Sequence, residues 1–121
     1  MKNTVAVGQA IYTAEEHLYY ERGTAAPRME YMVCTCAVEK LHPGLRRDIE
    51  AVGVLPGRGM VPRYLAVEDE GRTWFRTERD AALQAQKLTE RYERRWGRFE
   101  PPLRRTWEAL LEEDSGETVP G

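Results

Sequence analysis

The chain has 121 residues, a net charge of −2, 41% hydrophobic residues and 31% charged residues. This length provides for one domain with its own core, and no apolar run reaches the ~18 residues that cross a bilayer. The first residues lack the apolar stretch of a signal peptide, and two cysteines, Cys34 and Cys36, are too few for a disulfide framework. We therefore predict a soluble cytoplasmic protein with free thiols and no cofactor.

The first two thirds of the chain are predicted to form β-structure. Five segments have strand patterns, namely 5–12, 30–39, 48–55, 63–68 and 72–76. The last two flank Asp69-Glu70-Gly71, a tight connection that predicts a hairpin. Residues 15–28 show no clean period and are interpreted as a loop or a short helical turn. Residues 56–62, with two prolines and two glycines, are interpreted as a loop.

After residue 76 the apolar period becomes helical. Thr77 and Asp80 have the spacing of a capping box, and apolar residues then recur with helical spacing as far as Trp96, before Gly97. This pattern predicts a long helix over 78–96. A shorter helix is expected over 102–111, where proline suits the first turn.

These elements together predict an α+β fold in one domain of residues 1–111. Residues 5–76 are expected to form a small, strongly bent antiparallel sheet or barrel of about five strands. The long C-terminal helix and the short second helix pack on it. Residues 112–121, which are acidic and lack an apolar period, are expected to be a loosely ordered tail.

Basic residues gather on one face of the predicted long helix. Lys87, Arg91, Arg94 and Arg98 follow each other at i, i+4, i+7 and i+11 and fall within a band about 60° wide. The acids of this segment lie on another side, whereas a mixed-sign face is the usual choice for solubility. The sorted face suits phosphate oxygens, an acidic protein surface or the chain's own acidic tail.

Three further residues are candidates for ligand or partner binding. Tyr19 and Tyr20 fall in the irregular segment 15–28, and tyrosine beside arginine on loops is typical of protein interfaces and nucleotide-stacking pockets. The alternative is a loop folded over the barrel. Arg58 lies between Gly57 and Gly59, where backbone N–H groups and a guanidinium together suit a phosphate, although a plain turn is favoured because no helix follows.

Reactive residues are few, and we predict no catalytic residue and no metal site. Cys34 and Cys36, with His17 and His42, would make four soft zinc ligands, but an extended C-x-C strand wraps a metal poorly. A nucleophile pair of Cys34 and His42 would need a lowered thiol pKa and an oxyanion hole, neither of which the sequence indicates.

Three short motifs carry a family resemblance. VGQAIY at 7–12, VEK at 38–40 and WFRTERDAA at 74–82 resemble small phage and prophage accessory proteins, in which an SH3-like or KOW-like β-barrel precedes a helix. The chain departs from that pattern by an insertion at 13–29 and by its extra C-terminal helix. The resemblance implies a non-enzymatic role in a host bacterial cytoplasm, for instance as an inhibitor of a defence effector or a sponge for a nucleotide signal.

The leading hypothesis is therefore a phage-type binding protein that inhibits or sequesters a host factor, either a defence effector protein or a nucleotide signal. Its expected working surface comprises Tyr19, Tyr20, Arg58, Lys87, Arg91, Arg94 and Arg98. A nucleic-acid-binding barrel module is the alternative, although the net charge of −2 disfavours it. A small enzyme that depends on Cys34 or a metal is the third hypothesis. No membrane partner is expected, and a homo-oligomer is compatible with the sequence.

Overall fold

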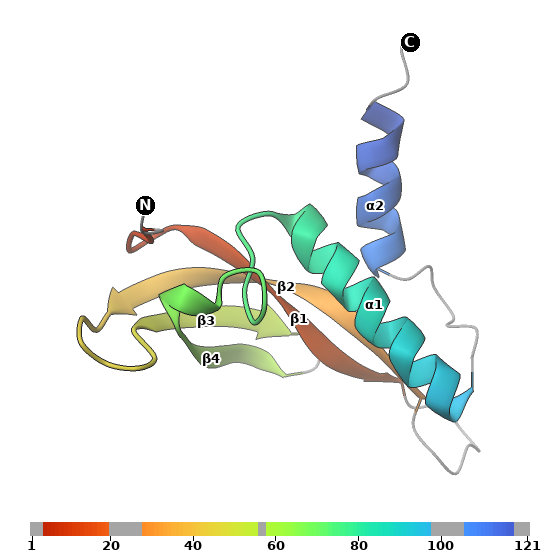
Figure 1. Ribbon diagram of the computed structural model, residues 1–121, viewed down its shortest axis with the longest axis horizontal. Helices are drawn as coiled ribbons and strands as arrows, with labels where there is room; N and C mark the ends of the chain where they lie inside the picture. The colour runs from red at the N-terminus through yellow and green to blue at the C-terminus, as the bar shows by residue number, and fades with distance from the viewer. Residues whose placement is uncertain (1–3, 20–27, 56–57, 98–105, 118–121) are drawn as a thin grey trace.

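The computed structural model describes residues 4–19, 28–55, 58–97 and 106–117. The elements are the strands β1 (Ala10–Tyr19), β2 (Arg28–Leu41), β3 (Ile49–Leu55) and β4 (Gly59–Leu65), the 3-10 turn η1 (Val67–Asp69), and the helices α1 (Glu78–Trp96) and α2 (Thr106–Glu117). The strands form one antiparallel sheet in the order β1-β2-β3-β4. Helix α1 lies across the sheet, and α2 projects from α1 (Figure 1). The predicted α+β architecture is confirmed, with four strands in place of about five.

The predicted fifth strand, over 72–76, is wrong. Within the described residues this segment makes only two isolated bridges, Glu70 with Trp74 and Tyr12 with Phe75. The indole of Trp74 turns into the core, where its Nε1–H donates to the carbonyl oxygen of Ala66 at 2.7 Å. The segment therefore seals one end of the core, and the sheet stays open because β1 and β4 do not pair.

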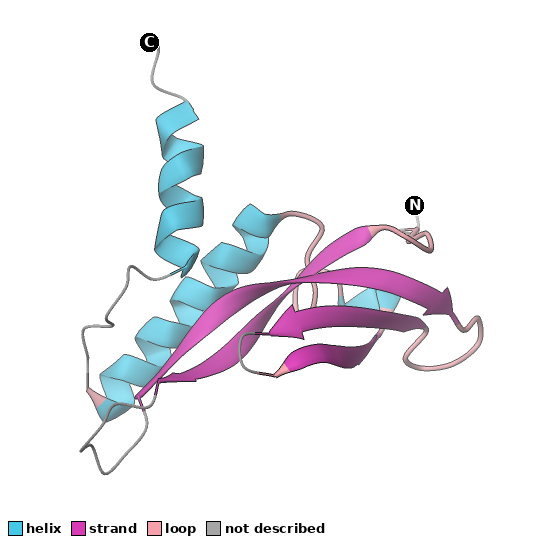
Figure 2. Ribbon diagram, turned by 180° about the vertical axis from the view of Figure 1, so that it is seen from behind, coloured by secondary structure: helices cyan, strands magenta, loops and turns pink. Residues whose placement is uncertain are grey.

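Two predicted loops are wrong at their boundaries. β1 continues to Tyr19 and β2 begins at Arg28, so both described ends of the expected loop 15–28 belong to a long β1–β2 hairpin, which Figure 2 shows reaching beyond β3 and β4. The sequence does not show the strand pattern of β1 beyond Tyr12, because the side chains that β1 points toward the core, such as Thr13 and Glu15, are polar. β4 begins at Gly59, inside the expected loop 56–62, and accepts Pro62 because it is an edge strand.

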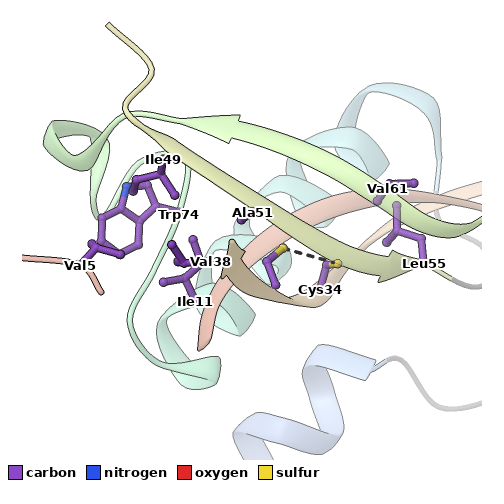
Figure 3. Close-up of a cluster of buried hydrophobic side chains, with 10 residues drawn as sticks. Val5, Ile11, Cys34, Val38, Ile49, Ala51, Leu55, Val61 and Trp74 are labelled. Atoms are coloured by element: carbon purple, nitrogen blue, oxygen red, sulfur yellow. Dashed lines mark hydrogen bonds between the residues drawn. The ribbon is translucent and has the colours of Figure 1, made fainter. Parts of the chain in front are cut away.

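The main core lies on one face of the sheet, which we call the inner face. Alternate residues of all four strands point there, and the segment that carries Trp74 closes one end. Its buried members are Val5, Ile11, Cys34, Cys36, Val38, Ile49, Ala51, Leu55, Val61 and Trp74. Figure 3 shows Trp74 with Ile49 and Val5 at one end of this cluster, Leu55 and Val61 at the other, and the cysteines between them.

Helix α1 covers part of the opposite, outer face, over β1 and β2. It begins as predicted, because the Thr77 hydroxyl accepts from the backbone N–H of Asp80 at 3.1 Å, and it ends at Gly97, whose φ is 95°. Its buried face is built from small residues, which let the helix approach the strands closely. The buried Thr89 hydroxyl accepts from the backbone N–H of Tyr31 at 2.9 Å, a strand donor that β3 does not reach.

Helix α2 packs against α1 through Trp107, which is buried with Ala82 and Ala85 in a second, smaller core. The short helix was predicted over 102–111, but α2 spans Thr106–Glu117. The expected loose tail is thus helical as far as Glu117, because glutamates sustain a helix even where no apolar period is visible. No helix in the described part of the chain is long and apolar enough to cross a membrane.

Candidate binding surface

The cations predicted on the long helix are exposed on α1. Lys87, Arg91 and Arg94 lie about half a turn away from the buried alanines, on the side of the helix that faces solvent. Among the described residues none of these three side chains takes part in an ion pair. Arg98, the fourth member of the predicted row, lies outside the described residues. We call Lys87, Arg91 and Arg94 the cationic face.

An aromatic platform lies at the end of α1, on the side of the helix opposite the cationic face, because Trp96 follows the buried Thr89 by seven residues. The side chain of Trp96 is 67% exposed, the guanidinium carbon of Arg95 lies 5.3 Å from the centroid of its ring, and the ring of Tyr92 lies 6.5 Å away. A tryptophan held between an arginine and a tyrosine presents apolar area at a small entropic cost, as the central residues of protein interfaces do. Trp96 ends the apolar stripe that predicted the long helix, but the structure leaves it exposed and not in the core.

Arg58 does not join the cationic face. It is exposed in the connection between β3 and β4, and its positive charge helps to lower the pKa of Glu15, a residue of the inner face. The charge of Arg91 instead opposes the rise in the pKa of Tyr31 that burial causes, and Tyr31 lies on the outer face. The sheet thus separates the two sets of cations, so they do not assemble into one phosphate site.

The predicted tyrosines lie at the β1–β2 hairpin. Tyr19 is the last residue of β1, paired with Arg28 of β2, rather than part of an irregular loop. Tyr20 follows it and lies outside the described residues. The structure therefore places the backbone of Tyr19 at the far end of the hairpin.

A polar cluster occupies the inner face beside the cysteines. The guanidinium of Arg63 on β4 donates through Nε and Nη2 to the two carboxylate oxygens of Glu15 at 2.9 and 2.8 Å, and the Thr13 hydroxyl donates to the same carboxylate at 2.7 Å. Burial raises the pKa of Glu15, but these hydrogen bonds and the charge of Arg63 outweigh it, so the pKa lies below its usual value. The cluster is internally satisfied and ties β1 to β4.

The two cysteines are buried thiols of the inner face. The Sγ atoms lie 4.0 Å apart, and Cys34 also lies 3.6 Å from the carbonyl oxygen of Val54. The hydrogen bond from Cys36 lowers the pKa of Cys34 to about 7 although burial raises it, and the same bond together with burial raises the pKa of Cys36. Cys34 therefore ionises first, but both sulfurs are closed off from solvent and from any substrate.

The histidines do not approach the thiols. His42 follows β2, eight residues or roughly 25 Å along the chain from Cys34, and its Nε2 pairs with Glu50 at 3.0 Å. His17 lies opposite Glu30 in the β1–β2 register, four residues along β1 from the partner of Cys34. Across the described residues no three metal-ligating side chains converge. The structure does not assemble the cysteine–histidine pair or the four-ligand zinc set that the sequence analysis weighed.

Sequence reasoning missed an apolar surface on the outer face of β3 and β4. Val54, Met60 and Tyr64 point away from the core and are 66%, 72% and 53% exposed. The signal was present in the sequence, because β3 and β4 read as nearly continuous apolar runs rather than as alternating ones. Such runs are typical of strands that are covered on both faces.

Comparison with protein-family models, with curated proteins and with solved structures finds no match to this chain. The resemblance to phage accessory proteins accordingly rests on its three short motifs.

Proposed function

We propose that this chain is a non-enzymatic binding protein whose cationic face recognises an acidic surface on another protein. The supporting observation is that Lys87, Arg91 and Arg94 are exposed in a row on a helix that the sheet holds in place, with no ion pair to a described acid. Charges on a rigid element match a complementary row of carboxylates without first having to be ordered.

The form of this surface favours a macromolecular target over a small nucleotide. Small ligands bind in concave sites that bury most of their surface, whereas the cationic face lies on the solvent side of a helix and encloses nothing. In the setting that the family resemblance implies, the target is a host factor, and binding inhibits or sequesters it in the bacterial cytoplasm.

A nucleic acid is the second candidate target, because exposed arginines suit a phosphate backbone and the exposed Trp96, with Arg95 over its ring, suits a stacked base. That function predicts an affinity that falls steeply as salt is raised. The net charge of −2 weighs against it. We therefore favour a protein target over a nucleic acid.

Charge reversal tests the proposal. The variant Arg91→Glu/Arg94→Glu and the full wild-type chain are each used to capture partners from nuclease-treated bacterial lysate, with quantitative mass spectrometry as the readout. We expect a partner with an acidic surface to be depleted about tenfold or more, since two attractive charges become repulsive. The matched control is Arg46→Glu/Arg47→Glu, an equal charge change at exposed positions between β2 and β3.

Each outcome discriminates. Loss in the α1 variant alone supports the cationic face as the binding surface. Equal capture by all three proteins contradicts it, and equal loss in both variants indicates dependence on total charge. Retention of labelled DNA or RNA by the wild type, weakened in the α1 variant and falling steeply as salt is raised, would favour the nucleic-acid alternative.

A further inference from the structure

Helix α1 leaves half of the outer face without cover. It packs on β1 and β2, while the outer side chains of β3 and β4 form an apolar surface of Val52, Val54, Met60, Pro62 and Tyr64, which we call the β3–β4 face. In antiparallel sheets one side is normally packed and the other polar. Here the exposed side is mostly apolar as well. Its acid, Glu50, pairs with Tyr64 at one end of the face, where the carboxylate lies 3.0 Å from Nε2 of His42.

The register makes this face continuous. Val54 is paired with Met60 and Val52 with Pro62 across the two strands, and the outward residue of β2 next to Val52 is the exposed Ala37. Cross-strand neighbours on one side of a sheet touch each other. The apolar side chains therefore form one patch, and patches of this kind on small proteins mark interaction sites.

Chemistry and geometry limit what covers this patch. The centre of this face is uncharged and offers nothing to a nucleic acid or to a charged ligand. Pro62 has no N–H to donate, so the free edge of β4 is a poor template for an added strand, and an occupant has to pack on the face. Sheets stack about 10 Å apart, a gap close to the diameter of a helix, so a second sheet fits in the layer that α1 only half fills.

We propose that the β3–β4 face is a homodimer interface, in which the same face of a second copy of this chain completes the outer layer. The apolar centre of this face is complementary to itself across a two-fold axis, because Glu50 lies at one end of the face, beside His42, and not at its centre. The composition agrees, because homodimer interfaces are more apolar than contacts between proteins that also exist apart.

The size of the face sets the expected affinity. At about 3.3 Å per residue and about 4.8 Å between strands, β3, β4 and the adjoining part of β2 cover roughly 330 Å² in projection. Side chains that stand out from the sheet expose more than this, so two copies bury on the order of 1,000 Å² in total, near the lower limit for a specific interface. The dimer is therefore expected to dissociate in the micromolar range.

Sedimentation velocity over a concentration series tests this with the full chain. The wild type should pass from monomer to dimer at micromolar concentration. The variant Val54→Thr/Met60→Gln should weaken the dimer by about tenfold or more, because it places polar groups at the centre of the contact. The matched control is Val7→Thr, since Val7 is 62% exposed but lies outside the β3–β4 face. Both variants change exposed side chains, and circular dichroism checks that each is folded.

A wild type that stays monomeric well above micromolar concentration overturns the proposal, including the case in which the face instead binds a different protein. A dimer that survives Val54→Thr/Met60→Gln overturns it as well. The variant Arg91→Glu/Arg94→Glu separates this inference from the proposed function. It should dimerise like the wild type, and loss of the dimer in that variant would assign the contact to α1.

Discussion

Gly53 of β3 lies directly against the two thiols. A Cβ atom at this position would meet the Sγ of Cys34 at 2.7 Å and that of Cys36 at 2.9 Å, both closer than real contacts allow. The backbone of Gly53 is not in the left-handed region, so the requirement for glycine here is steric. The two cysteines and the glycine therefore form one packing unit in the core.

We expect Gly53→Ala to lower the free energy of unfolding by about 1–3 kcal/mol, the range for an added methyl in a packed core. Urea denaturation measures this. Because the clash is with the sulfurs, Cys34→Ala should offset part of the loss in the double variant. A double-mutant cycle with no coupling between the two positions would contradict this account of the contact.

The bounds of α1 could be predicted because every signal is local: the Thr77 cap, the helical period and Gly97 all lie within the helix and its flanks. The end of β1 could not be predicted, because its inward residues are polar. Glu15 is accommodated there by Arg63 of a distant strand, and Thr13 donates to the same carboxylate. The same contrast holds for the binding surface. Helical spacing placed Lys87, Arg91 and Arg94 on one face, but the separation of Arg58 depends on how the sheet is arranged.

The contribution of the N-terminal cap to the stability of α1 can be measured by substituting Thr77. The Thr77 hydroxyl satisfies the backbone N–H of Asp80, so Thr77→Ala should cost about 1 kcal/mol of stability, and Thr77→Ser should cost little. Thermal or urea unfolding of the three proteins gives the comparison. If Thr77→Ser lowers the free energy of unfolding as much as Thr77→Ala does, the hydroxyl is not what stabilises the helix.

Over the whole molecule, the bidentate contact between Glu15 and Arg63 links the first strand to the last. The sheet does not close by backbone pairing, so this partly buried contact joins its two edge strands, β1 and β4, through side chains. The pKa of Glu15 is lowered in the folded state, because the hydrogen bonds and charge of Arg63 outweigh the effect of burial. The contact therefore stabilises the fold above the unfolded pKa of the carboxyl, about 4.3, and is lost as pH falls through the lower folded value.

We expect Arg63→Met to destabilise the protein by about 2 kcal/mol at neutral pH, since it leaves a partly buried carboxylate without its charged donor. The loss should shrink as the solution is acidified and Glu15 becomes protonated. Glu15→Gln should flatten the acid limb of the pH–stability profile, while the exposed Glu68→Gln should leave it unchanged. A deficit in Arg63→Met that is equal at every pH would show that packing, and not charge, makes the contact important.

The order β1-β2-β3-β4 means that every strand pairs with its neighbour in the chain. Each hairpin can therefore form as soon as its second strand has left the ribosome, and the connections between strands are short where the structure describes them. Helix α1, which packs on β1 and β2, arrives after its platform is complete. The molecule can thus assemble in the order in which it is synthesised, and the outer face of β1 and β2 stays uncovered until α1 has followed β3 and β4.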